Sequence, residues 1–340
     1  MRRKSMKVRI INQSDVRSLL PMSACIEVMS ETLQSLARGD AVQPLRSAMR
    51  LPDKRGLLGM MPAFIGKPRT MGVKVISVFP GNVGTEYESH QGAVLLFDAD
   101  HGQLLAVIDA GEITAIRTAA VSGVATGILA KKDASDLAIL GSGTQACSHL
   151  EAMRLVRDIR RVRVWSLPLD HAREFAARQS ERHGISVEFM ETSRAAVEGA
   201  DIICTVTSAK EPVLCGEWIE AGAHINAVGS SNPFSRELDT AAVVKSRMFV
   251  DRLESVLNEA GDFLFPKKEG AVSDDHILGE IGDILLNKLE GRQTETEITL
   301  FECLGLSVED VASAHYIYAK AVDRDIGSLA ELTGEHHGQS

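Results

Sequence analysis

The stretch that decides the fold runs from Asp136 to Arg157 and reads DLAILGSGTQACSHLEAMRLVR. A short apolar run, Leu137–Leu140, meets the turn Gly141–Ala146, and a segment with apolar residues on one helical face follows. This order predicts a strand, a tight glycine turn and a helix, which is the opening unit of a dinucleotide-binding fold.

The turn has the residue types that a pyrophosphate site needs. Gly141 permits a sharp turn, Gly143 lets the backbone approach a phosphate, and the small Ala146 lets the helix pack closely on the strand. The start of the helix adds N–H groups and the positive end of its dipole. A GxGxxA pattern also occurs at ordinary strand–helix turns, but the flanking strand and helix favour a nucleotide site.

Length and composition exclude several classes of protein. The 340 residues suffice for two domains, and 44% hydrophobic with 24% charged residues is typical of a globular chain. The net charge is −9 and the basic residues are scattered, so we expect no nucleic-acid partner. No apolar stretch approaches the roughly 18–20 residues of a membrane span, and Met6–Val16 lacks the apolar core of a signal peptide. We therefore expect a cytoplasmic protein without a membrane partner.

Cysteines and histidines show no metal-binding or disulfide pattern. Five cysteines are an odd number and have no CxxC spacing, which favours reduced, packed thiols. The ten histidines form neither HExxH nor HxH. We expect no metal site.

The chain before the glycine turn predicts an α+β region. A strand at Val8–Ile11 and a helix from about Ser23 to Gly39 come first, and β-rich runs separated by Gly, Pro and Asn follow, which predict a mostly antiparallel sheet. A helix of small residues, Thr114–Ala130, leads to the turn.

After the turn, strands and helices alternate, which predicts a doubly wound parallel sheet. The last predicted strand is Arg247–Asp251. The amphipathic helix Val308–Arg324 is expected to return to the first region.

The carboxyl edge of such a sheet faces the cofactor, so the ends of later strands should lie near the nicotinamide. The predicted cofactor contacts are Gly141, Ser142, Gly143, Thr144, Gln145, Ser166, Val206, Thr207, Gly229 and Ser231.

The residues after Trp165 bear on the choice between NAD and NADP. The expected acid for ribose hydroxyls is absent from Leu167–Leu169, and so is an arginine for a 2′-phosphate. NAD is slightly favoured, because a 2′-phosphate would be poorly paired beside two leucines. Arg173 or His171 could still fold back and bind it.

Three cations of the first region are candidate catalytic residues: Arg46, Lys74 and Arg117. Lys74 lies mid-strand between two valines, where a lysine points to solvent or, if buried, has a lowered pKa that suits acid–base chemistry. Arg117 lies among small apolar residues and needs an anion, either Glu112 or a substrate carboxylate.

Several motifs resemble the ornithine cyclodeaminase/mu-crystallin family over about residues 8–325. They are LGMMPAF (Leu58–Phe64), SHQGAVLLFDADHGQLLAVID (Ser89–Asp109), EITAIRTAAVSGVAT (Glu112–Thr126), GSGTQACSH (Gly141–His149) and GEWIEAGAHINAVGSSNPFSREL (Gly216–Leu238).

The resemblance implies a Rossmann domain, a doubly wound parallel sheet at residues 129–311, inserted into an α+β substrate-binding and dimerisation domain made of residues 1–128 and 312–340. It implies a homodimer. It also implies that Arg46, Lys74 and Arg117 stand where the family contacts the substrate carboxylate.

Two departures distinguish the chain from ornithine cyclodeaminases. These have an acid in the strand corresponding to Leu58–Met61, where this chain has Gly59, and an aspartate where it has Ser231. Without those carboxylates the chain is closer to the mu-crystallin-like ketimine reductases.

We therefore expect an NAD(P)H-dependent reductase of small cyclic ketimine carboxylates, such as 1-pyrroline-2-carboxylate or 1-piperideine-2-carboxylate, that can also run as an amino-acid dehydrogenase. The ring size of the substrate would depend on Met60, Met61, Phe79 and Asn232. One alternative is an ornithine cyclodeaminase that uses Asp239 or Glu237 as a substitute acid. The other is a non-catalytic cofactor-binding protein.

Overall fold

The computed structural model describes residues 6–82 and 84–332. By its contacts the described part of the chain divides into two compact units, one up to Arg117 together with the residues from Leu306 onward, and the other Thr118–Gly305. Both boundaries differ from the expected ones after residues 128 and 311. The first lies inside helix α3 (Ala110–Leu129), whose residues are buried along most of its length, so no change of amphipathic pattern marks it in the sequence.

The first unit is built on one eight-stranded sheet with the order β16-β1-β7-β6-β5-β4-β2, and β3 pairs with β4. All pairings are antiparallel except β1 with β7, as the sequence predicted. The strands are β1 (Lys7–Ile11), β2 (Ala41–Val42), β3 (Ser47–Arg50), β4 (Leu57–Gly66), β5 (Arg69–Val78), β6 (His90–Asp98), β7 (Leu104–Asp109) and β16 (Ser328–Glu331).

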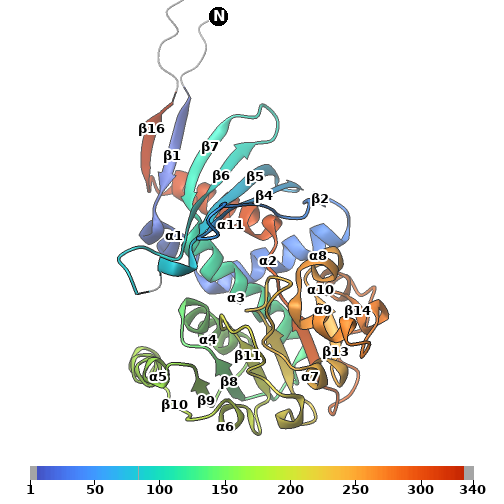
Figure 1. The fold of residues 1–340 in the computed structure, drawn as a ribbon. Helices are drawn as coiled ribbons and strands as arrows, with labels where there is room; N and C mark the ends of the chain where they lie inside the picture. The colour runs from blue at the N-terminus through green and yellow to red at the C-terminus, as the bar shows by residue number, and fades with distance from the viewer. Residues whose placement is uncertain (1–5, 83, 333–340) are drawn as a thin grey trace, which may run out of the picture. The chain divides into compact units, whose positions relative to one another are not determined.

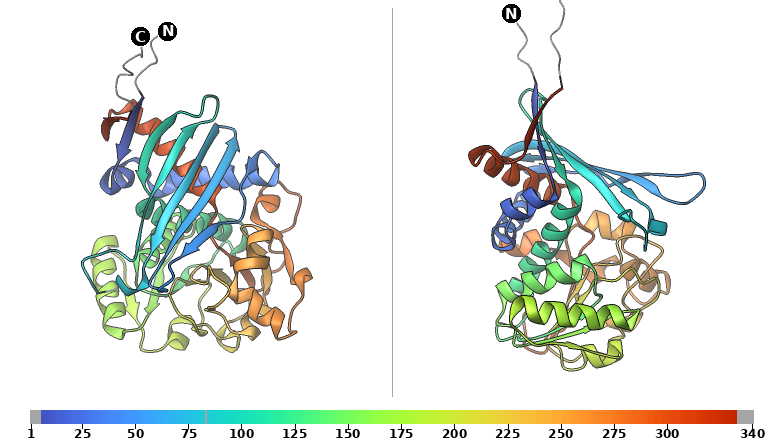
Figure 2. Two further views of the ribbon diagram at one scale, coloured as in Figure 1. Left: turned by 45° about the horizontal axis from the view of Figure 1, so that its top comes forward. Right: turned by 90° about the vertical axis from the view of Figure 1, so that its left-hand side faces the viewer.

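Helices cover one face of this sheet (Figure 2). The C-terminal helix α11 packs on β4, β5 and β6, and α2 packs on α11. The return of the last helix to the first region is therefore confirmed. The helices of this unit are α1 (Gln13–Leu19), η1 (Pro80–Asn82), α2 (Met22–Ala37), the first part of α3, and α11 (Ser307–Asp323).

The second unit holds a parallel eight-stranded sheet with the order β10-β9-β8-β11-β12-β15-β13-β14 (Figure 1). The chain order reverses between β8 and β11, and this is the switch point at which doubly wound sheets bind their ligands. The strands are β8 (Asp136–Leu140), β9 (Arg161–Trp165), β10 (Val187–Phe189), β11 (Ile202–Thr205), β12 (His224–Ala227), β13 (Arg247–Val250), β14 (Ile277–Glu280) and β15 (Thr299–Glu302).

The doubly wound fold predicted from the glycine turn is confirmed, but two of its strands, β14 and β15, were not predicted. β15 lies between β12 and β13, because the short segment TLFE at Thr299–Glu302 follows a polar stretch and gives little pattern of its own. The helices of the second unit are α4 (Thr144–Val156), α5 (Leu169–His183), α6 (Ser193–Val197), η2 (Gly216–Trp218), α7 (Thr240–Val244), α8 (Leu253–Glu259), α9 (Gly261–Lys268), η3 (Asp274–His276) and α10 (Ile281–Leu285).

The described part of the chain contains no helix with both the length and the apolar character needed to cross a bilayer. All five cysteines are free thiols, and Cys25, Cys204 and Cys303 are buried.

Candidate active site

The glycine turn has the geometry that its sequence predicts. Gly141 adopts φ +127°, and a Cβ there would lie 2.6 Å from the carbonyl oxygen of Val206. A side chain at this position would therefore be strained and would clash with the backbone that follows β11. Ala146 is fully buried, as close packing of helix on strand requires.

The start of α4 is open toward a ligand. Gly143 is the N-cap residue of α4 and provides no side-chain cap, and a Cβ built on it would meet nothing within 4 Å among the described residues. The Ser142 hydroxyl lies 2.7 Å from that of Ser166, at the end of β9. This arrangement fits the phosphates of a dinucleotide, because backbone N–H groups at a helix N-terminus stabilise phosphate charge.

The segments after β11 and β12 are joined by one buried carboxylate, Glu237. One oxygen accepts hydrogen bonds from the backbone N–H and the hydroxyl of Thr207, both at 2.6 Å, and the other accepts from the N–H of Gly229 at 2.7 Å. Val206 and Thr207 therefore lie beside Gly229, whereas Ser231 is exposed.

The structure gives both substitute acids of the cyclodeaminase hypothesis other roles. Glu237 is fully buried and binds backbone, as described above. Asp239 is the N-cap of α7, where one of its oxygens accepts from the N–H groups of Ala242 (2.7 Å) and Gly216 (2.9 Å). In the structure the oxygens of both residues therefore stabilise loops and a helix start.

The residues after β9 bear on the choice between NAD and NADP. The Leu167 side chain is exposed, and the Arg173 guanidinium lies 4.7 Å from the centre of the Phe189 ring. Arg173 is thus stacked on an aromatic side chain and not folded back toward Ser166. The geometry agrees with the preference for NAD.

In the first unit, Lys74 lies on the helix-covered face of the sheet. It pairs with Met61 of β4 and Val94 of β6, and side chains of directly paired residues share a face. Only 3% of Lys74 is exposed, while its neighbours Val73 and Val75 are half-buried on the opposite face. Of the two alternatives for Lys74, a solvent-exposed or a buried lysine, the structure therefore has the buried one.

Two helices supply the groups around the Lys74 ammonium. Its Nζ lies 2.7 Å from Oδ2 of Asp310, in the first turn of α11, and donates to the Thr114 hydroxyl of α3 at 3.4 Å. Burial lowers the pKa of Lys74 to about 8. Repulsion from Arg117 and Arg46 contributes to this decrease, and attraction to Asp310 opposes it. A lysine with this pKa can give and accept a proton near neutrality.

Arg117 joins the same cluster, again through α11. Its Nε donates to Oδ1 of Asp310 at 2.9 Å and its Nη1 to Oε2 of Glu309 at 3.0 Å, and all three residues are buried. The suggested structural partner, Glu112, instead forms an ion pair with Arg17 at 2.8 Å. Arg117 does have protein carboxylates as partners, but they come from the far end of the sequence.

The third cation, Arg46, is half-buried between β2 and β3 and is close enough to Lys74 to lower its pKa. The structure thus brings together all three candidate cations. Asp310, held between two of them, has a lowered pKa because Arg117 and Lys74 outweigh its burial.

The residues expected to determine the ring size of the substrate do not all lie on the same side of the sheet. Met60 alternates with Met61 on β4, so it lies on the face of the sheet opposite Lys74 and is 42% exposed. Met61 shares the face of Lys74. Asn232 is engaged in its own loop, where it donates to the Ser235 hydroxyl and accepts from the N–H of Phe234. Strand alternation thus separates Met60 from Lys74.

Sequence reasoning missed Glu309 and Asp310. The signal was present in SVEDVASA at the start of α11, where two adjacent acids stand among small and apolar residues. Adjacent acids in a segment that is otherwise buried need cations, and the cations were already identified.

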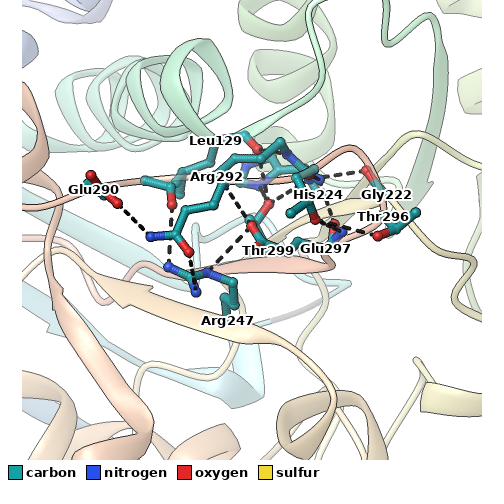
Figure 3. Close-up of polar contacts among 12 residues, drawn as sticks. Leu129, Gly222, His224, Arg247, Glu290, Arg292, Thr296, Glu297 and Thr299 are labelled. Carbon is teal, nitrogen blue, oxygen red and sulfur yellow. Dashed lines mark hydrogen bonds and ion pairs between the residues drawn. The ribbon is translucent and has the colours of Figure 1, made fainter.

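The second unit also contains an open hollow that is not part of this site. Ile284 and residues Asn287–Gln293 line it. One of the lining residues, Arg292, binds the backbone carbonyls of Leu129 and Gly222 and the hydroxyl of Thr299, at the amino ends of β12 and β15 (Figure 3). Ligands of doubly wound sheets bind at the carboxyl ends, so this guanidinium network holds strands and loops together.

Comparison with known proteins decides the family. The family model described as "Ornithine cyclodeaminase/mu-crystallin family" matches residues 6–325. The chain belongs to this family. Mouse ketimine reductase mu-crystallin is 39% identical over 280 residues, which are 82% of this chain and 85% of the relative.

Two solved structures are similar over nearly the full length. Thermococcus litoralis Δ1-pyrroline-2-carboxylate reductase, in complex with NADH and L-proline, has a TM-score of 0.92 and 37% identity, with 94% of this chain and 99% of that chain covered. An archaeal alanine dehydrogenase dimer with bound NAD has a TM-score of 0.91 and 31% identity, covering 96% and 100%.

Proposed function

We propose that the protein is an NAD(P)H-dependent reductase of small cyclic ketimine carboxylates, such as 1-pyrroline-2-carboxylate or 1-piperideine-2-carboxylate. The observation that carries the proposal is the buried cluster of Lys74 and Arg117 on the two carboxylates of α11, with Arg46 close by. The glycine turn of a doubly wound sheet accompanies it in the same chain, and the relatives named above include reductases of this kind.

The cluster residues can bind and orient an imino acid. Arg46 and Arg117 attract the carboxylate, and a guanidinium can do so in two-point geometry. Lys74 adds positive charge and holds the proton that the imine nitrogen takes up. Its lowered pKa makes that transfer easy near neutrality.

When bound, the reduced nicotinamide supplies the hydride that the imine carbon accepts. The nitrogen gains one proton, so the C=N bond becomes CH–NH and the dinucleotide is oxidised. The reverse direction is the oxidation of a cyclic or simple α-amino acid, in which Lys74 accepts the proton. The same residues therefore support an amino-acid dehydrogenase.

Ornithine cyclisation is not favoured. The chain has Gly59 and Ser231 where the cyclodeaminases carry acids, and Glu237 and Asp239 bind backbone. A binding-only role is disfavoured because a buried lysine with a pKa near neutrality serves proton transfer more directly than storage.

The proposal is tested by the loss of NADH and of NADPH absorbance with each cyclic imine, beside ammonia release from ornithine. We expect turnover of the imine carboxylates, faster with NADH, and no ammonia from ornithine. No turnover of any imine carboxylate would overturn the proposal. An Arg117→Ala variant that binds NADH and loses turnover would reject the binding-only alternative.

We also propose that the first unit forms a homodimer through the open face of its sheet. The solvent-exposed face of an antiparallel sheet usually carries polar side chains. On the open face of this sheet, the strands carry apolar side chains instead. They are Ile10, Met60, Pro62, Phe64, Met71, Val73, Val75, Leu95, Phe97 and Val107, of which Ile10 and Met60 are exposed large hydrophobics.

Such a continuous apolar face favours a second copy of the chain as its cover. Light scattering should give twice the mass of the chain, and a Val73→Glu, Leu95→Glu variant should be monomeric. A monomeric wild-type protein at micromolar concentration would contradict the dimer without affecting the proposed chemistry.

A further inference from the structure

Glu237 has contacts that go beyond those of a structural carboxylate. Its two oxygens bind the segments that follow two different strands, Thr207 after β11 and Gly229 after β12. β11 flanks the switch point and β12 is its neighbour, so both segments lie at the carboxyl edge where the nicotinamide half of a dinucleotide binds.

The packing around Gly229 leaves no room for a side chain on this residue. A Cβ on this residue would lie 2.2 Å from the carbonyl oxygen of Thr207 and 2.6 Å from Cδ of Glu237. The two segments and the carboxylate are therefore in direct contact, and the position of Glu237 sets the distance between the segments.

Further buried carboxyl groups surround Glu237. Oδ1 of Asp262 accepts hydrogen bonds from the N–H groups of Glu237 and Leu238, at 2.7 and 2.8 Å. Among the described residues, Oδ2 of Asp262 and Oε2 of Glu302 are buried without a hydrogen-bond partner. Asp251, which binds the N–H groups of Leu304 and Gly305, is also close enough to act on Glu302.

These acids have few cations to neutralise them. The charged groups that act on Asp262 are Glu237, Glu302 and Arg236, and Arg236 is itself paired with Glu269. Burial, with repulsion from Glu237, raises the pKa of Asp262 to about 8. Burial, with repulsion from Asp262, raises the pKa of Glu302 well above its usual range. Burial also raises the pKa of Glu237, against the hydrogen bonds from Thr207 and Gly229.

We propose that Glu237 is a positioning residue for the nicotinamide half of the cofactor, with the buried carboxyl group of Asp262 behind it. Glu237 draws the segments at Thr207 and Gly229 together, and a proton on Asp262 limits the repulsion between the two carboxyl groups. When Asp262 loses its proton, a second negative charge faces Glu237 and the two segments loosen. The inference rests on the proposed function only in taking NADH as the ligand.

The test compares two ligands on matched variants. NADH and ADP-ribose, which lacks the nicotinamide, are titrated calorimetrically into wild type, Glu237→Gln and Asp239→Asn. Asp239 is a good control because it too is a carboxylate bound to two backbone N–H groups, but those belong to Gly216 and Ala242.

We expect Glu237→Gln to weaken NADH binding about tenfold or more, since an amide loses the charge-assisted bonds and turns N–H groups toward N–H donors. ADP-ribose binding should change less than about twofold, and Asp239→Asn should affect neither ligand. A parallel loss of both ligands, or no loss of NADH, would overturn the inference. A wild-type protein that does not bind NADH would instead overturn the proposed function.

If Glu237→Gln does not fold, the Asp262→Asn variant tests the inference through the pH dependence of NADH binding. Wild-type affinity for NADH should fall several-fold as the pH rises through about 8, where Asp262 ionises, and Asp262→Asn should abolish that fall because an amide cannot gain charge. Wild-type affinity that is independent of pH, or an unchanged fall in Asp262→Asn, would contradict the role of the proton.

Discussion

The Lys74–Arg117 cluster of the first unit and the Glu237 cluster of the second unit are neutralised in different ways. In the first unit, the cations Lys74 and Arg117 face the carboxylates of Glu309 and Asp310, so unlike charges neutralise one another. In the second, Glu237, Asp262 and Glu302 are all acids, and backbone N–H groups and protons neutralise them.

The difference indicates that the two clusters have different functions. A cluster of mixed charge with a titratable lysine can exchange partners with an anionic substrate and move a proton. A cluster of acids stabilised by backbone N–H groups cannot leave its partners without loosening loops, so it suits positioning.

Removing a cation of the first cluster should have the largest effect. Arg117→Ala should lower kcat/KM for an imine carboxylate by about 100- to 1000-fold, because the carboxylate loses a partner and Glu309 and Asp310 are left with one cation fewer. The NADH dissociation constant, measured in parallel by fluorescence, should stay within about threefold. Equal losses in both would show that Arg117 only supports the fold.

Removing one acid from each cluster gives a matched pair. Asp310→Asn should lower the free energy of unfolding by about 3 kcal/mol, since it leaves two buried cations underpaired. Asp262→Asn should cost less than about 1 kcal/mol at pH 7, because the native acid is already protonated and an amide replaces it closely. Urea denaturation measures both. Similar costs would contradict the difference between the clusters.

The proton on Lys74 should give mirrored pH profiles. Its folded-state pKa of about 8 means that the ammonium predominates below pH 8 and the free amine above it. Imine reduction, which needs the proton, should therefore decline above pH 8, and oxidation of the cyclic amino acid, which needs the amine, should decline below it. Steady-state rates in both directions measure this. Two profiles with the same shape would exclude Lys74 as the group that transfers the proton.

The smallest effect is expected from adding an acid to the first cluster. Gly59 lies on the same face as Lys74, and a Cβ on it would meet Ile76 at 3.4 Å, an ordinary contact. Gly59→Glu should therefore fold, and it should raise the pKa of Lys74, moving the pH midpoint of reduction upward by about one unit or less. Ala at the same position is the control for added volume, and an equal shift with Ala would contradict an electrostatic effect.

The sequence predicted more of the second unit than of the first site. Gly141 and Gly143 specify a turn through local backbone geometry, which a short motif can carry. The partners of Arg117 lie 192 and 193 residues away, and local patterns hold no information about such pairings. For that reason Glu112, near in sequence, was an attractive but wrong partner. Lys74 was identified for its apolar neighbours, yet only the register with Met61 and Val94 shows that it faces inward.

In the proposed reaction the substrate carboxylate is bound by the cationic cluster. The most direct measurement is the ratio of kcat/KM for 1-pyrroline-2-carboxylate to that for 1-pyrroline, the same ring without the carboxylate, with NADH as reductant. We predict a ratio of about 1000 or more in the wild type, which falls to about 10 or less in Arg117→Ala. Comparable rates on both imines, or a ratio unchanged by the substitution, would contradict the account.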